Sequence, residues 1–169
     1  MAAAHARSWR AAYAGLVPKR VIDDVVASEA ARAERWRGWL SDPARPGGCF
    51  VAELDSRVVG FVFWGPAESI ETAPAAGSDK AAPPVGEVFA IYLEPDAMGQ
   101  GVGRALMDAA VDALLDAGFA TAVLWVLASN DRARRFYEAA GWRPDGATKT
   151  EERPGGSLHE VRYARTLGG

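Results

Sequence analysis

The chain has too few cysteines and histidines to build a disulfide or a structural zinc site. Cys49 is the single cysteine among 169 residues, and there are two histidines. A lone cysteine has no internal disulfide partner, and structural zinc sites draw their ligands mainly from cysteine and histidine. We therefore expect no bound metal, and we expect Cys49 to pack as a small apolar side chain.

Long apolar runs and a large excess of one charge are also missing. The longest apolar run, residues 58–65, is much shorter than the roughly 20 residues that cross a bilayer. The first residues, MAAAHARSWR, contain no apolar block typical of a signal peptide. A net charge of −3 provides no electrostatic attraction to nucleic acid or an anionic membrane. The sequence thus predicts a cytoplasmic protein without nucleic-acid or membrane partners, folded as a single domain over residues 1–169.

The hydrophobic pattern predicts a helical first third followed by a β-hairpin. Apolar residues at helical spacing indicate a helix through residues 9–16 and a second helix that opens at Pro18. Ser28 is predicted to cap a third helix that runs to about Leu40 and buries Ala33, Trp36 and Leu40. Two β-rich runs, 49–54 and 57–65, are separated by only two residues, Asp55 and Ser56, which indicates a hairpin.

The second half alternates strands and helices. The predicted elements are a strand at 87–93, a helix that follows residue 101, a strand at 121–127, a short helix from Asn130 to Gly141, and a strand at 158–166. This order predicts an α/β (α+β) fold in which residues 87–127 form a right-handed parallel βαβ unit. Residues 66–86 are rich in proline, alanine and glycine, and we expect a mobile connector there.

Three glycines stand where the central helix is about to begin. They are Gly99, Gly101 and Gly103, in the stretch EPDAMGQGVGRALMDAA. A glycine-rich turn into a helix offers unpaired amide groups and the positive end of the helix dipole, and phosphate commonly binds there. Neither the dinucleotide-binding fingerprint nor the phosphate-loop motif fits this spacing, since the first needs other intervals and the second needs a lysine. Spacing alone leaves two alternatives: a phosphate-binding loop, or a tight turn without a ligand.

Three sequence blocks resemble the GNAT superfamily of acetyl-CoA-dependent N-acetyltransferases. MGQGVG, residues 98–103, is similar to the family pattern Gln/Arg-x-x-Gly-x-Gly/Ala, except that Met98 stands where glutamine or arginine is typical. ASNDRARRFYEAAGW, residues 128–142, resembles the second signature, and SWRAAYAGLVP, residues 8–18, is similar to the first-helix segment of many members. The resemblance implies a mixed central sheet flanked by helices. We expect the strand that precedes the first helix in the family to be missing, which would leave residues 49–54 at a sheet edge.

The resemblance also implies an acetyl-CoA site. In the family, backbone amides of the glycine-rich loop hold the pyrophosphate, and the strand before it binds pantetheine along its open edge. Carried onto this sequence, the cofactor-binding residues are Ile91, Leu93, Met98, Gly99, Gln100, Gly101, Val102, Gly103, Arg104 and Asn130. Tyr137 resembles the general acid that protonates the departing thiolate, and Glu87 stands where some members carry a general base.

Each of these residues also has a purely structural interpretation. Tyr137 could be a core residue of an amphipathic helix, Asn130 a helix cap, and Glu87 an ordinary charge at the start of a strand. Strand alternation places residues 87, 89, 91 and 93 on one face. Trp9 and Tyr13 could line the acceptor pocket, although aromatic residues at this spacing more often belong to the core.

The sequence thus predicts an N-acetyltransferase that moves an acetyl group from acetyl-CoA to a primary amine by direct transfer in a ternary complex. A small molecule or a peptide would supply the amine, and a homodimer is compatible with this interpretation. The alternative is a non-catalytic acyl-CoA-binding module that serves as a sensor. Tyr137 favours the enzyme, because a protein that only binds has no use for an acid beside the sulfur.

Overall fold

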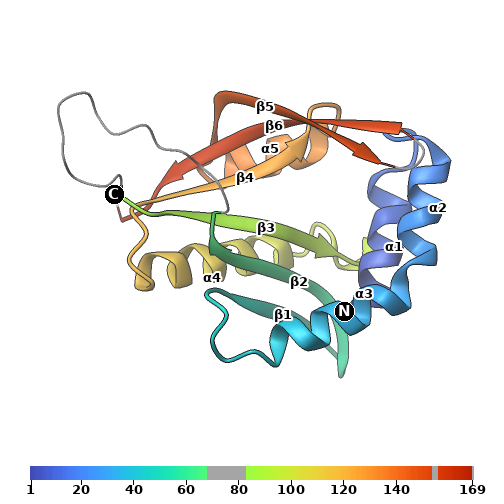
Figure 1. Cartoon of the computed structure of the whole chain (residues 1–169), viewed down its shortest axis with the longest axis horizontal. Coiled ribbons are helices and arrows are strands. Elements are labelled where there is room, and N and C mark those ends of the chain that lie inside the picture. Colours follow the sequence, from blue (N-terminus) through green and yellow to red (C-terminus); the bar gives the residue numbers. More distant parts are fainter. Residues whose placement is uncertain (68–82, 154–155, 169) are drawn as a thin grey trace.

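The centre of the molecule is a mixed six-stranded sheet in the order β1-β2-β3-β4-β6-β5 (Figure 1). The computed structural model describes residues 1–67, 83–153 and 156–168. The strands are β1 (Gly48–Leu54), β2 (Arg57–Pro66), β3 (Val85–Leu93), β4 (Thr121–Leu127), β5 (Arg143–Arg153) and β6 (Gly156–Thr166). Within the described ranges β3 and β4 are the one parallel pair, and every other pair of neighbours is antiparallel. The predicted mixed sheet with a parallel βαβ unit is confirmed.

Helices cover both faces of this sheet. They are α1 (Ala2–Ala12), α2 (Lys19–Ala27), α3 (Glu29–Leu40), α4 (Val102–Asp116) and α5 (Asp131–Ala139), with a short 3₁₀ turn, η1 (Pro95–Ala97), before α4. In Figure 1 the three N-terminal helices lie together beside the end of β3. None of the helices in the described residues is long and apolar enough to cross a membrane.

Two apolar clusters hold the layers together. On one face, Leu124 of β4 packs with Met107 and Leu114 of α4 in a cluster that also contains residues of α5. On the other, Trp9 of α1 and Val21 of α2 pack with residues at the ends of β4 and β6. The side chains of β4 are buried along almost its whole length, as the nearly continuous apolar run at 121–127 predicts for a strand covered on both faces.

The predicted hairpin is confirmed. β1 and β2 pair antiparallel, and the two residues between them, Asp55 and Ser56, both have positive φ, at 49° and 60°. Two consecutive left-handed residues make the turn whose twist matches that of the flanking strands. β1 lies at the edge of the sheet, as predicted for residues 49–54.

The expected burial of α3 is correct in part: Ala33 and Trp36 are half-buried, and Trp36 packs against the rings of Phe61 and Phe63, but the burial predicted for Leu40 is wrong. Leu40 is 51% exposed, and the buried residue of this helix is Arg32. Arg32 can be buried because its guanidinium donates to the carbonyl oxygen of Val25 at 2.8 Å and to the hydroxyl of Ser28 at 3.1 Å. Ser28 stands at the N-cap position, but its hydroxyl donates to the Val25 carbonyl at 3.1 Å and accepts no capping hydrogen bond.

One further strand and two element boundaries differ from the prediction. β5 was not expected, because its sequence RPDGATKTEER is polar and largely exposed and carries no apolar alternation. The helix predicted through residue 16 already ends at Ala12. The connector is shorter than 66–86, since Pro66 belongs to β2 and Val85 and Gly86 to β3. The expected mobility of that connector concerns mainly residues 68–82, which lie outside the described residues.

His5 is a buried titratable group within the aromatic packing of α1. Its ring lies 4.5 Å from that of Tyr92 and 5.5 Å from that of Trp36, measured between centroids, and the residue is 6% exposed. Burial lowers the pKa of His5 from 6.5 to about 3, and the nearby charge of Arg32 lowers it further. The imidazole is therefore neutral in the folded protein at pH values where the unfolded chain would protonate it.

This shift predicts a pH-dependent stability. Because the folded-state pKa lies below the unfolded value, the unfolded chain binds an extra proton between about pH 6.5 and 3, and stability falls as the pH decreases through that window. We expect His5→Leu to reduce the slope of the unfolding free energy against pH by about 1.4 kcal/mol per pH unit. Urea unfolding at pH 7, 6, 5 and 4.5 measures that slope. Equal slopes in both proteins would contradict the assignment.

Candidate active site

The sheet opens between β3 and β4. The two strands pair only from Val85 opposite Thr121 to Glu87 opposite Val123, although β3 continues to Leu93 and β4 to Leu127. On their other sides β3 stays paired with β2, and β4 with β6. The second half of β3 therefore presents one backbone edge to an opening, and backbone groups at such an edge need a partner.

A cavity of about 850 Å³ passes through this opening, and we call it the cleft. Its lining includes Gly103 and Tyr137 from the α4 and α5 side, and Trp9 and Tyr13 from the α1 side. The cleft therefore connects the two faces of the sheet. Ten of the twelve predicted site residues line it: Glu87, Ile91, Leu93, Met98, Gly99, Gly101, Gly103, Arg104, Asn130 and Tyr137.

The glycine-rich loop leads into α4 with two left-handed residues. Gly99 has φ +78° and Gly101 has φ +83°, and a Cβ atom added at either would meet no atom within 4 Å. Ala105 donates to the carbonyl oxygen of Gly101 at 3.0 Å, which starts the helical ladder. The amides of residues 102–104 precede that first bond and have no acceptor within the helix. The loop thus combines open space with unpaired donors at the positive end of a helix, which suits an anion.

Gln100 and Val102 are the two predicted residues that do not line the cleft. The Gln100 amide nitrogen donates to the carbonyl oxygen of Asp96 at 2.5 Å, and this contact folds the side chain back onto the loop. Val102 is half-buried and packs against the core cluster. Both side chains therefore shape the loop, and only their backbone groups remain to meet a ligand.

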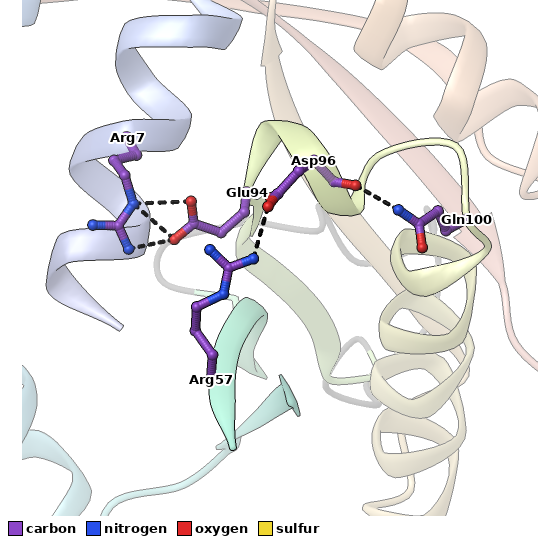
Figure 2. A network of polar contacts seen from close by, with 5 residues as sticks. All are labelled: Arg7, Arg57, Glu94, Asp96 and Gln100. Carbon is purple, nitrogen blue, oxygen red and sulfur yellow. Dashed lines mark hydrogen bonds and ion pairs between the residues drawn. The ribbon is translucent and has the colours of Figure 1, made fainter. Parts of the chain in front are cut away.

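A polar network ties the loop to α1 and β2 (Figure 2). Glu94, directly after β3, is 2% exposed, and its carboxylate accepts two hydrogen bonds of 2.9 Å from Nε of Arg7 on α1. Arg57 of β2 forms a 2.7 Å ion pair with Asp96 in η1. Of the two contacts, the one between Arg7 and Glu94 fixes geometry more strongly, because Glu94 is buried whereas Arg57 and Asp96 are both exposed. The network thus holds the start of the glycine-rich loop from two other elements of the fold.

On α5, Asn130 and Tyr137 face the cleft seven residues apart. Asn130 caps the helix, since its side-chain oxygen accepts from the amide of Ala133 at 3.1 Å. The capping interpretation is confirmed, and the residue also lines the cleft. Tyr137 is 9% exposed and belongs to the core cluster as well as to the cleft wall. Burial raises the pKa of Tyr137, and Tyr92 and Glu160 raise it further, so its hydroxyl stays protonated at neutral pH.

A β-bulge moves Glu87 to the opposite face from Ile91 and Leu93. Phe63 of β2 lies opposite Ala90, but the next residue, Trp64, lies opposite Val88. The extra residue in β3, Phe89, reverses the alternation of side chains. Val88 before the bulge and Ile91 after it both pack on the α4 side. The prediction that residues 87, 89, 91 and 93 share a face is therefore wrong, and half-buried Glu87 faces the α1 side of the cleft.

The α1 side of the cleft is aromatic and charged. The rings of Trp9 and Tyr13 lie 4.2 Å apart between centroids, and both residues line the cleft and pack in the apolar cluster of α1 and α2. Their place in the core is therefore confirmed, and a contact with the acceptor stays a prediction. His159 is exposed, and its Nδ1 lies 3.0 Å from the hydroxyl of Thr150.

Sequence reasoning missed four charged residues of the cleft wall. They come from β5 and β6 and form two pairs, Lys149 with Glu160 at 3.3 Å and Arg153 with Glu151 at 2.8 Å. Because the sequence did not predict β5, it also did not predict that side chains of β5 line the cleft together with those of α1. The alternating charges of KTEER were the available signal, because every second residue of a strand points to the same face.

Comparison with known proteins agrees with this fold. The sequence profile of the acetyltransferase (GNAT) family matches residues 9–142, which include both glycine-rich and α5 motifs. The chain belongs to this family.

Curated relatives are identical to this chain at about a third of the aligned positions. A mycothiol acetyltransferase of Frankia alni is 37% identical over 106 residues, which cover 63% of this chain and 29% of that protein. YuaI of Bacillus subtilis, an uncharacterized N-acetyltransferase, is 31% identical over 140 residues, or 82% of this chain and 70% of YuaI. The chain spans 29–38% of the length of the first mycothiol acetyltransferases that it matches.

Solved structures with the same fold include a GCN5-related N-acetyltransferase from Rhodopseudomonas palustris. Its TM-score is 0.70 at 20% identity, over 98% of this chain and 87% of that one. The PaiA N-acetyltransferase of Thermoplasma acidophilum, solved in complex with coenzyme A, has a TM-score of 0.66 at 18% identity, over 96% of this chain and 87% of that one. These similarities establish the fold.

Proposed function

We propose that the chain transfers an acetyl group from acetyl-CoA to a primary amine by direct attack in a ternary complex. The observation that carries this proposal is the cleft through the sheet. It brings together an anion-binding loop, an open strand edge and a protonated tyrosine on one face, and a carboxylate with aromatic walls on the other. Two substrates could thus enter from opposite faces and meet between β3 and β4.

The α4 side fits the coenzyme. Acetyl-CoA would supply an acetyl group activated as a thioester. The loop that contains Met98, Gly99, Gln100, Gly101, Val102, Gly103 and Arg104 would hold the pyrophosphate through its amides, in the open space beside Gly99 and Gly101. The backbone of Ile91 and Leu93 at the open edge of β3 would bind the pantetheine amides like a neighbouring strand, and Asn130 would contact the same arm.

The chemical roles follow from the two sides of the cleft. Glu87 accepts a proton from the ammonium group through water, and the neutral amine then attacks the carbonyl carbon. The carbon–sulfur bond breaks as the attacking nitrogen loses its second proton to water and the new carbon–nitrogen bond becomes an amide. Tyr137 donates its proton to the departing thiolate, which its raised pKa permits because the hydroxyl carries that proton at neutral pH. The amide, free CoA and a deprotonated tyrosine result, and solvent reprotonates the tyrosine.

Cys49, the one cysteine of the sequence, supports direct transfer over an acyl-cysteine intermediate. It lies on edge strand β1, away from the cleft lining. Burial raises its pKa to about 11, so it is largely a thiol at neutral pH and a weak nucleophile.

A thiol-release assay tests the proposed function. Protein, acetyl-CoA and a panel of alkyl amines, aryl amines, amino acids and short peptides are incubated, and free CoA is measured against a control without amine. We expect amine-dependent release with at least one acceptor class, together with the acetylated amine by mass spectrometry. Tight acetyl-CoA binding by calorimetry without release from any amine would favour the sensor alternative.

A further inference from the structure

A second cavity, of about 630 Å³, lies on the face of the sheet that α3 covers. Aromatic rings from four elements make most of its wall: His5 of α1, Trp36 and Trp39 of α3, Phe63 of β2, and Phe89 and Tyr92 of β3. The rings of Trp39 and Phe63 meet edge to face with centroids 4.7 Å apart, and those of Trp36 and Phe63 are tilted with centroids 5.2 Å apart. A concave aromatic wall of this kind binds flat apolar groups.

One polar atom of this wall has no partner among the described residues. Nδ1 of His5 is buried and makes no hydrogen bond, and the whole residue is 6% exposed. Because this nitrogen is itself buried, it offers a ligand in the cavity no hydrogen bond. His5 therefore contributes ring surface to the wall, which suits the flat apolar part of a small molecule.

Three of the four charged residues at the rim, Glu34, Asp42 and Arg45, are already engaged with the protein, and the fourth, Arg35, is exposed. Glu34 forms an ion pair with Arg37, and Oδ1 of Asp42 accepts from the amide of Ala44 at 2.9 Å. The guanidinium carbon of Arg45 lies 4.6 Å from the centroid of the Trp39 ring. The aromatic walls thus select a flat apolar group, and the exposed guanidinium of Arg35 disfavours a positive charge on that group.

This cavity adjoins the cleft. Phe89, Ala90 and Tyr92 line both. Glu87, which faces the α1 side of the cleft, is two residues from Phe89, a span of about 7 Å along a strand. A short linker of two or three carbon atoms therefore bridges an amine held near Glu87 and a ring held in the aromatic cavity.

We propose that the aromatic cavity receives the apolar body of the acceptor, so that the preferred acceptor is an amine joined by a short linker to an aromatic ring. This inference rests on the proposed function, because it assigns the acceptor class to the same cleft. Phe89 belongs to the wall of both cavities because of the bulge, and the ring of the acceptor would pass it on the way to Trp36 and Trp39.

The experiment compares two amines in the thiol-release assay, 2-phenylethylamine and ethylamine. We expect wild-type kcat/KM to be at least about tenfold higher for 2-phenylethylamine. Trp39→Ala should reduce that preference about tenfold and leave kcat/KM for ethylamine nearly unchanged. Leu40→Ala is the matched control, since Leu40 follows Trp39 on α3, is 51% exposed and does not line the cavity. An unchanged preference in Trp39→Ala, or equal losses for both amines, overturns the proposal.

Direct binding separates failure of this inference from failure of the proposed function. The affinity of CoA-loaded protein for 2-phenylethylamine is measured by calorimetry, which needs no turnover. Binding that Trp39→Ala weakens about tenfold and Leu40→Ala preserves supports the cavity even when no amine releases thiol. Absent binding, or equal affinity in wild type and Trp39→Ala, contradicts it. Trp39→Leu, which retains apolar packing against Phe63, replaces Trp39→Ala if the alanine variant does not fold.

Discussion

Tyr137→Phe should lower kcat by about 10²–10⁴-fold and leave acetyl-CoA affinity nearly unchanged. The substitution keeps the ring, which packs 5.4 Å from Phe136 and 6.2 Å from Tyr163 between centroids, and removes only the hydroxyl. In the proposed mechanism that hydroxyl acts as the thiolate leaves, so its loss affects the transition state and not the ground-state complex. Single-turnover rates on a good acceptor, together with calorimetry for acetyl-CoA, measure the two effects separately.

Tyr163→Phe is the matched control for Tyr137→Phe. Tyr163 is also a buried tyrosine, but its hydroxyl donates to Glu138 at 2.7 Å and accepts from Arg134 at 3.1 Å, outside the cleft lining. Losing these hydrogen bonds should lower stability and preserve turnover. Wild-type single-turnover rates in Tyr137→Phe, where chemistry limits the rate, would make Tyr137 a core residue with no catalytic role.

Gly101→Val should weaken CoA binding about 100-fold. The added side chain would enter the open space beside the loop, where the pyrophosphate must approach the amides. Charge-assisted hydrogen bonds contribute about 1.5–3 kcal/mol each, so the loss of one or two corresponds to about 100-fold in affinity. Calorimetric titration with CoA measures this directly.

Gly118→Val provides the control for backbone strain. Gly118 follows the other end of α4 at φ +89°, close to the +83° of Gly101, and a Cβ atom at either position meets no atom within 4 Å. Valine should therefore cost similar folding free energy at both positions, because neither φ suits a β-branched residue. Affinity lost equally in both variants would mean that strain, and not obstruction of the loop, explains Gly101→Val.

The elements with strong local signals could be predicted from the sequence. Asp55 and Ser56 between two β-rich runs predicted the hairpin, and Asn130 predicted the start of α5, because a turn or a cap depends on residues a few positions apart. Ten of the twelve predicted site residues line one cleft for a related reason. Most of them belong to two short motifs, and each motif folds as one turn into a helix.

The features that the sequence could not supply depend on contacts between distant segments. β5 is a strand because β6 pairs with it, and its polar sequence has no apolar pattern of its own. Arg32 is buried and Leu40 exposed because of how α3 lies on the sheet, which helical spacing does not specify. The network from Arg7 to Glu94 joins residues 87 positions apart.

The sequence by itself determined the family motifs, the order of most elements and the position of the glycine-rich turn, since all of these are encoded over short stretches of chain. The tertiary structure decided on which side of the sheet each group acts. A single extra residue at Phe89 moves Glu87 to the α1 face and leaves Ile91 and Leu93 facing α4. Strand alternation has a period of two, so one bulge reverses every side chain beyond it, and only the pairing with β2 reveals that bulge.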